Sequence, residues 1–85
     1  MIDVKSARYV EGYKVWIEFS NEESGVVDLE PDLRGPMFEP LKDPEKFKKF
    51  RVSGILRTLI WDNGANFAPE YLYSKIATQS FKSTV

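Results

Sequence analysis

The stretch WDNGANFAPEYLY, residues 61–73, joins a turn signal to a helix start. Asn63-Gly64 is a strong signal for a short hairpin turn, because both residues tolerate a positive φ. Pro69 suits the first position of a helix, where its missing N–H costs nothing. An apolar pair around this start and an acidic first turn favour a helix locked against a sheet. The residues of this expected structural corner are Gly64, Phe67, Pro69, Glu70 and Leu72.

The first third of the chain predicts antiparallel strands. The pair Glu11-Gly12 predicts a hairpin turn, because glycine readily takes a positive φ. From Tyr13 to Phe19 apolar and polar residues alternate, which predicts one buried and one solvent-facing side. Trp16 is the exception on the polar side. A third short strand is expected over residues 26–29, before Pro31, which lacks the N–H needed to continue a ladder.

The middle of the chain predicts a short helix followed by another strand. Residues 38–41 have turn chemistry, with two apolar side chains that we expect to plug the core. Asp43-Pro44-Glu45 is a typical helix start, because Asp43 can cap and proline suits the first position. Phe47 and Phe50, three residues apart, predict the buried stripe of that helix. Residues 55–61 carry apolar side chains on both alternating faces, which predicts a more central strand.

These signals together predict one α+β domain. The 85 residues fit a single domain. We expect a small, curled, mostly antiparallel sheet of about four to five strands with two short helices. The domain is expected to span residues 1–77, with the second helix over 69–77 and a flexible tail over 78–85. The chain lacks the roughly 20-residue apolar run that spans a bilayer and the apolar segment of a signal peptide, so we expect a cytoplasmic protein without a membrane partner.

The sequence contains no cysteine and no histidine. These absences exclude disulfides, thiolate nucleophiles, thiol metal sites and an imidazole general base. Asp62 to Tyr73 lacks the acidic spacing of an EF-hand loop, and Glu70 suits a helix start better than acid–base chemistry. We therefore predict no enzyme, no catalytic residue, no metal ligand and no cofactor. A small-molecule or metal-dependent enzyme is kept as a third hypothesis.

Charge is unevenly distributed along the chain. Residues 1–41 carry four basic and nine acidic residues, whereas residues 42–85 carry eight and four. The basic excess lies in segment 42–57 and indicates either a solvated helix face or an electrostatic docking surface. The residues expected to steer a partner are Lys46, Lys48, Lys49 and Arg51. The net charge of −1 argues against strong non-specific binding of nucleic acid.

Several side chains around the corner are not required by the fold. Exposed aromatic rings beside amide and carboxylate groups are typical of a docking patch for a protein, and such rings also stack on single-stranded bases. The residues predicted to bind a partner are Trp61, Asp62, Asn63, Tyr71 and Tyr73. Complementary charge halves and an exposed edge strand also leave a homo-oligomer open.

The whole pattern resembles a known family. The matching segments are Tyr13–Phe19, Val26–Leu29, Phe38–Leu41, Phe47 and the W-x-N-G-A-[DN]-x-A-P-E-x-L-Y pattern of residues 61–73. Together they resemble the small bacterial domain-of-unknown-function family 2442, up to about residue 76. The resemblance implies a small α+β fold, as in one domain of a larger bacterial protein. No catalytic residues are established for the family, so none are carried over.

The resemblance also implies partners. Some relatives are fused to a helix-turn-helix DNA-binding domain, and others are encoded beside a second small protein in what look like toxin–antitoxin pairs. This chain has Asn66 where the family often has Asp, and it ends at Val85, so we expect no fused DNA-binding domain. We hypothesise a non-enzymatic module that binds a small protein, the product of a neighbouring gene, as an antitoxin-like member of such a pair. The alternative is a nucleic-acid-binding or transcription-regulatory accessory domain acting through segment 42–57.

Overall fold

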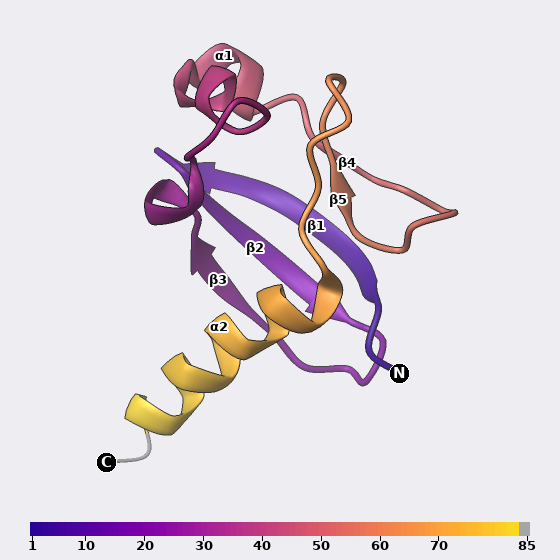
Figure 1. Cartoon of the computed structure of the whole chain (residues 1–85). Coiled ribbons are helices and arrows are strands. Elements are labelled where there is room, and N and C mark those ends of the chain that lie inside the picture. Colours follow the sequence, from indigo (N-terminus) through magenta and orange to yellow (C-terminus); the bar gives the residue numbers. More distant parts are fainter. Residues whose placement is uncertain (84–85) are drawn as a thin grey trace.

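The structure is a computed structural model that describes the backbone of residues 1–83 and the side chains of residues 1–76. Figure 1 shows a short helix, α1, and a longer one, α2, at opposite ends of a twisted sheet. The elements in chain order are the strands β1 (Val4–Glu11), β2 (Lys14–Phe19) and β3 (Ser24–Asp28), the 3-10 turns η1 (Glu30–Asp32) and η2 (Glu39–Lys42), the helix α1 (Pro44–Phe47), the strands β4 (Arg51–Val52) and β5 (Leu59–Ile60), and the helix α2 (Pro69–Ser83).

The predicted α+β class is confirmed, with the strands divided between two sheets. β1, β2 and β3 pair in that order as an antiparallel sheet, and β4 and β5 form a separate antiparallel pair. The amide of Val4 donates to the carbonyl of Arg57 over 3.0 Å and links the two sheets. The first hairpin turns one residue later than predicted. Glu11 pairs with Lys14, so the two turn residues are Gly12 and Tyr13, and Gly12 takes φ +53°.

The alternation along β2 has the predicted consequence. Val15, Ile17 and Phe19 point into the core and are fully buried. Trp16 lies on the opposite face, where it is half-buried. The guanidinium of Arg8 lies 4.9 Å from the centroid of the Trp16 ring. A cation over an aromatic face is favourable and covers apolar surface, which explains how this face accommodates a tryptophan.

The predicted strand over residues 55–61 is wrong. The hydroxyl oxygen of Ser53 accepts from the amides of Ile55, at 3.2 Å, and Leu56, at 3.0 Å. Serine side chains compete in this way for amides that a ladder would need. The chain therefore curls into a loop at the start of the predicted strand, with Arg57 at φ +59°, and only β5 remains paired.

The predicted helix start at Asp43 is confirmed. The Asp43 carboxylate accepts from the amide of Glu45 at 3.0 Å, and Pro44 is the first residue of α1. Phe47 is fully buried, while Phe50 packs against the core from its edge. A cap of this kind matters because α1 is only one turn long and cannot be stable through its own hydrogen bonds.

Helix α2 begins at Pro69 as predicted but continues to Ser83, beyond the predicted end at residue 77. Its buried face includes Leu72 and Ile76, four residues apart. Residues 84–85 lie outside the described part of the chain. The domain boundary at residue 77 and the flexible tail over 78–85 stay predictions.

Candidate partner-binding site

The turn that follows β5 is a three-residue loop fixed by hydrogen bonds. The amide of Gly64 donates to the carbonyl of Trp61 at 2.9 Å, and the amide of Trp61 donates to the carbonyl of Ala65 at 3.0 Å. Gly64 takes φ +89°, whereas Asn63 does not have a positive φ. The Asn63 side-chain oxygen accepts from the amide of Ala65 at 3.0 Å. The predicted position of this turn is therefore confirmed, although only Gly64 of the Asn63-Gly64 pair has a left-handed backbone conformation.

Trp61 does not present a free ring, so this expectation is wrong. Its side chain is 2% exposed and its indole nitrogen donates to the carbonyl of Phe47 at 2.8 Å. Ring centroids of Phe47, Phe50 and Phe67 lie 5.7, 6.0 and 6.0 Å from it. A buried indole needs a partner for its N–H, and the carbonyl near the end of α1 supplies one. Trp61 thus fixes the turn to α1.

A hollow of about 350 Å³ opens beside this turn. We call it the lysine hollow, and its lining residues are Pro40, Leu41, Lys46, Lys49, Trp61, Asp62 and Asn63. η2 and Trp61 supply apolar groups, α1 and the turn directly after it supply one cation each, and the turn after β5 supplies an amide and a carboxylate. The hollow therefore unites residues 40–49 with residues 61–63, which are separate in the sequence.

Two of the four predicted steering residues leave uncompensated charge at the lysine hollow. Lys48 pairs with Glu45 at 3.5 Å, and Arg51 pairs with Asp62 at 3.1 Å. Lys46 and Lys49 are exposed and have no ion-pair partner among the described side chains. An apolar hollow with two such cations favours a ligand that joins an apolar group to negative charge.

Asn63 has a structural role at the hollow, because both polar groups of its side chain are already hydrogen-bonded. Its side-chain nitrogen donates to the carbonyl of Met37 at 2.8 Å, so the loop before η2 is tied to the turn. A Cβ built on Gly64 would lie 3.6 Å from the methyl carbon of Met37. Met37 and η2 were not predicted as site residues. Their local sequence contains no pattern that indicates a contact with a turn more than twenty residues later.

Tyr71 and Tyr73 lie on α2 and not at the lysine hollow. The Tyr73 hydroxyl donates to the Glu23 carboxylate at 3.1 Å, and its ring packs edge-on against Phe19 with centroids 5.3 Å apart. The Tyr71 hydroxyl donates to Asp32. Figure 1 shows α2 at the end of the molecule opposite α1. The five predicted partner-binding residues therefore do not form one patch.

Asp32 organises a cluster that fixes η1 to α2. Its carboxylate accepts from the Tyr71 hydroxyl and lies 2.9 Å from the Lys75 ammonium. The hydrogen bond to Asp32 raises the pKa of Tyr71 above its usual value, since the carboxylate favours the protonated phenol, and burial adds to this effect. With the lysine over the Tyr71 ring at 5.5 Å, the cluster has a structural explanation.

The corner residues lie as follows. Phe67 stacks on Phe38 with ring centroids 4.7 Å apart, Leu72 is fully buried, and Pro69 begins α2. Glu70 is exposed in the first turn of that helix. Among the described residues, no three or more acidic side chains gather as a metal site. In the same part of the chain, no helix has the length and apolar character needed to cross a membrane.

Comparisons with known proteins agree with this fold. The family described as "Protein of unknown function (DUF2442)" matches residues 4–78. No curated protein matches the chain. One similar crystal structure is described as "Putative DNA Binding Protein NE0471" from Nitrosomonas europaea ATCC 19718, with a TM-score of 0.79, 22% sequence identity, and coverage of 94% of this chain and 52% of that one. The chain spans about half of that protein, and at this identity the likeness shows the fold alone.

Proposed function

The chain belongs to the DUF2442 family, as its sequence resemblance predicts, and on that premise we propose that it is a non-enzymatic protein-interaction module. The proposed partner is a small protein encoded by a neighbouring gene, with this chain as the antitoxin-like member of the pair. The cytoplasmic location expected from the sequence belongs to the same proposal. The observation that carries it is the lysine hollow.

The chemistry of the lysine hollow suits an acidic segment of the partner. Lys46 and Lys49 form no ion pair among the described side chains, and the carboxylate of the hollow, Asp62, pairs with Arg51, so a carboxylate of the partner at the rim would meet two cations. Pro40 is exposed at the hollow, and the almost fully buried Leu41 and Trp61 lie behind it, so the apolar part of the lining can receive a partner side chain. Apolar anchors supply most of the affinity of an interface, while charges set approach and orientation. The proposed ligand is therefore an acidic peptide segment that carries a bulky apolar residue.

Co-expression with the neighbouring gene product tests this proposal. We expect the two proteins to co-purify, and the double substitution Lys46→Glu with Lys49→Glu to abolish the association. The control is Lys14→Glu with Arg34→Glu, which changes net charge equally at exposed positions outside the hollow and outside the predicted steering residues. Association that survives the first double variant, or that never forms with wild-type protein, contradicts the proposal.

Nucleic-acid binding is the second candidate function. The same unpaired lysines lie in basic segment 42–57, and the similar Nitrosomonas protein is described as DNA binding. Phosphate contacts would make binding fall steeply with salt, and losing one lysine contact would reduce the salt slope by about one. Mobility-shift titrations at several salt concentrations, with wild-type protein and the Lys46→Glu, Lys49→Glu variant, distinguish this candidate. Binding to nucleic acid that the variant retains would contradict it.

A further inference from the structure

The loop between β4 and β5 exposes two adjacent aliphatic side chains. Ile55 is 92% exposed and Leu56 is 48% exposed. Figure 1 shows the tip of this loop projecting away from α1 and α2. Single apolar residues on a surface are ordinary, whereas a neighbouring pair at the tip of a projecting loop needs a physical reason.

The loop is held in this shape by several hydrogen bonds. Ser53 accepts from the amides of Ile55 and Leu56 through its side chain, and its carbonyl accepts from the amide of Arg57 at 2.8 Å. The carbonyl of Arg57 in turn accepts from the amide of Val4 on β1 at 3.0 Å. Arg57 takes φ +59°, which is unfavourable for a residue with a side chain. The fold therefore accepts local strain while it presents the apolar pair.

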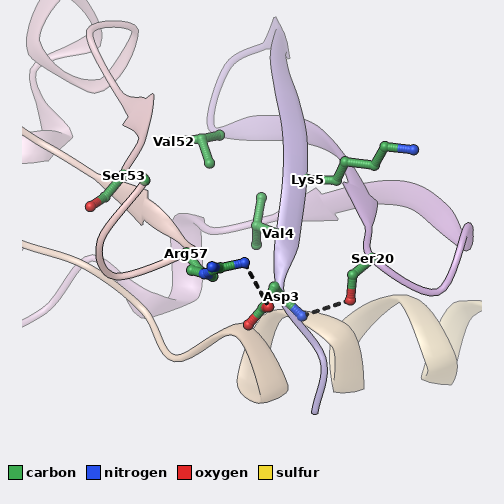
Figure 2. Close-up of a pocket in the computed structure, with 8 residues that line it drawn as sticks. Asp3, Val4, Lys5, Ser20, Val52, Ser53 and Arg57 are labelled. Atoms are coloured by element: carbon green, nitrogen blue, oxygen red, sulfur yellow. Dashed lines mark hydrogen bonds and ion pairs between the residues drawn. The ribbon is translucent and has the colours of Figure 1, made fainter.

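A second hollow, of about 450 Å³, lies against the same loop. We call it the loop hollow, and its lining residues are Asp3, Val4, Lys5, Ser20, Val52, Ser53, Gly54 and Arg57. Figure 2 shows the Arg57 side chain directed toward Asp3, with Val4 and Val52 above this ion pair. The Arg57 and Asp3 charges are 3.7 Å apart. Gly54 and Arg57 flank Ile55 and Leu56 in the sequence and also line the loop hollow.

We propose that this face is the interface between two copies of the chain, in which Ile55 and Leu56 of each copy enter the loop hollow of the other. A two-fold interface uses the same patch on both copies, so the patch must carry both a projection and the cavity that receives it. The described residues place these two features side by side. A foreign partner would have to supply both complementary shapes, which favours a second copy as the occupant.

The charges at the rim fit the same arrangement. Asp3 and Arg57 have opposite signs and lie 3.7 Å apart in one chain, so an interface whose two-fold axis passes beside this pair lets the anion of one copy face the cation of the other. The proposed interface is centred on one loop and one hollow, whereas a standard stable complex buries roughly 800 Å² per partner. We therefore expect a weak, reversible dimer. The inference does not rest on the proposed function, since the lysine hollow has other lining residues.

Sedimentation velocity from about 10 μM to about 1 mM protein tests the inference, a range that covers weak association. We expect wild-type protein to approach twice the monomer mass as concentration rises. Ile55→Ser with Leu56→Ser is expected to weaken association by at least about tenfold. Val10→Ser is the matched control, because Val10 is an exposed aliphatic residue outside this face. Circular dichroism checks that each variant folds.

A charge exchange provides the second arm. Asp3→Arg alone and Arg57→Asp alone are each expected to weaken the homodimer, and an equimolar mixture of the two variants is expected to form a heterodimer, because opposite signs then meet between the two copies. The ion pair within the chain is broken in both variants and does not account for that association. Aspartate is also among the residues that best tolerate the left-handed backbone at position 57. A wild-type monomer at the highest concentration overturns the inference. A dimer that Ile55→Ser with Leu56→Ser leaves intact, or that Val10→Ser weakens equally, also overturns it.

Discussion

At the scale of single residues, backbone conformation separates two glycines that look alike in the sequence. Gly64 has φ +89° and closes the turn beside the lysine hollow, whereas Gly54 has an ordinary φ and open space where a Cβ would lie. A side chain is strained only in the first case. The glycine of the Asn63-Gly64 signal is therefore required by its backbone, and Gly54 is not.

We predict that Gly64→Ala lowers the free energy of unfolding by about 1–3 kcal/mol, the usual cost of a strained left-handed residue. Gly54→Ala is the matched control and is expected to change stability by less than about 1 kcal/mol in either direction. Urea denaturation followed by circular dichroism measures both variants. Equal losses in the two variants would contradict the assignment of the strain to Gly64.

The Tyr71 hydroxyl gives a second prediction at this scale, through its pKa. Its hydrogen bond to Asp32 raises the folded-state pKa above the unfolded value of about 10. A raised pKa contributes stability that is complete below pH of about 10 and is lost as pH rises through the folded pKa. Wild-type stability should therefore fall more steeply above pH of about 10 than that of Tyr71→Phe. Denaturation curves across alkaline pH test this, and parallel pH profiles would refute it.

At the scale of elements, α1 shows how a one-turn helix is kept in place. The Asp43 cap satisfies its first turn, and the Trp61 indole donates to the Phe47 carbonyl at its other end. The helix carries Lys46, and Lys49 follows in the turn directly after it, so the position of α1 sets the shape of the lysine hollow. The hydrogen bond from the Trp61 indole to the Phe47 carbonyl therefore helps to set the shape of the lysine hollow.

We predict that Trp61→Phe destabilises the protein by about 1–3 kcal/mol, because the buried Phe47 carbonyl loses its donor. Trp16→Phe is the control, since that ring is half-buried on the open face of the sheet, and its cost is expected to stay below about 1 kcal/mol. Thermal unfolding by circular dichroism compares the two. A larger loss of stability in Trp16→Phe than in Trp61→Phe would contradict the role assigned to Trp61 in fixing the turn.

The sequence predicts those elements whose signals are local. Asp43-Pro44 and Pro69 identify helix starts because a cap or a proline acts within one turn. Residues 55–61 mislead because hydrophobic alternation cannot reveal that the Ser53 hydroxyl takes two amides out of the expected ladder. For the pair Tyr71 and Tyr73, helix geometry alone argues against one patch, since residues two apart do not share a helix face.

At the scale of the whole molecule, each hollow joins segments that are remote in the sequence. The neighbouring η2 and α1 meet the turn after β5 because Phe47, Trp61 and Phe67 pack together in the core. No pattern within any one segment encodes such a meeting, so the sequence predicted several lining residues but not the hollow itself. The loop hollow likewise joins the start of β1 to the loop after β4.

We predict that the two surfaces act independently. Ile55→Ser with Leu56→Ser should leave binding of the neighbouring gene product unchanged, and Lys46→Glu with Lys49→Glu should leave the dimer unchanged. The physical reason is that distant sites with no shared partners contribute additively, and the two hollows share no lining residue. Titration calorimetry and sedimentation on all four proteins measure this. Coupling larger than about tenfold in affinity would show that the surfaces communicate.

The two tryptophans occupy different environments, and this difference has a practical consequence. Trp61 is enclosed among aromatic rings at the floor of the lysine hollow, while Trp16 lies beneath the Arg8 guanidinium on the open sheet. After Trp16→Phe, a single tryptophan would remain beside the four tyrosines, and the tryptophan emission would come from the candidate site alone. An acidic peptide settling over Lys46 and Lys49 could then be followed by the ultraviolet emission of the protein, without any attached dye.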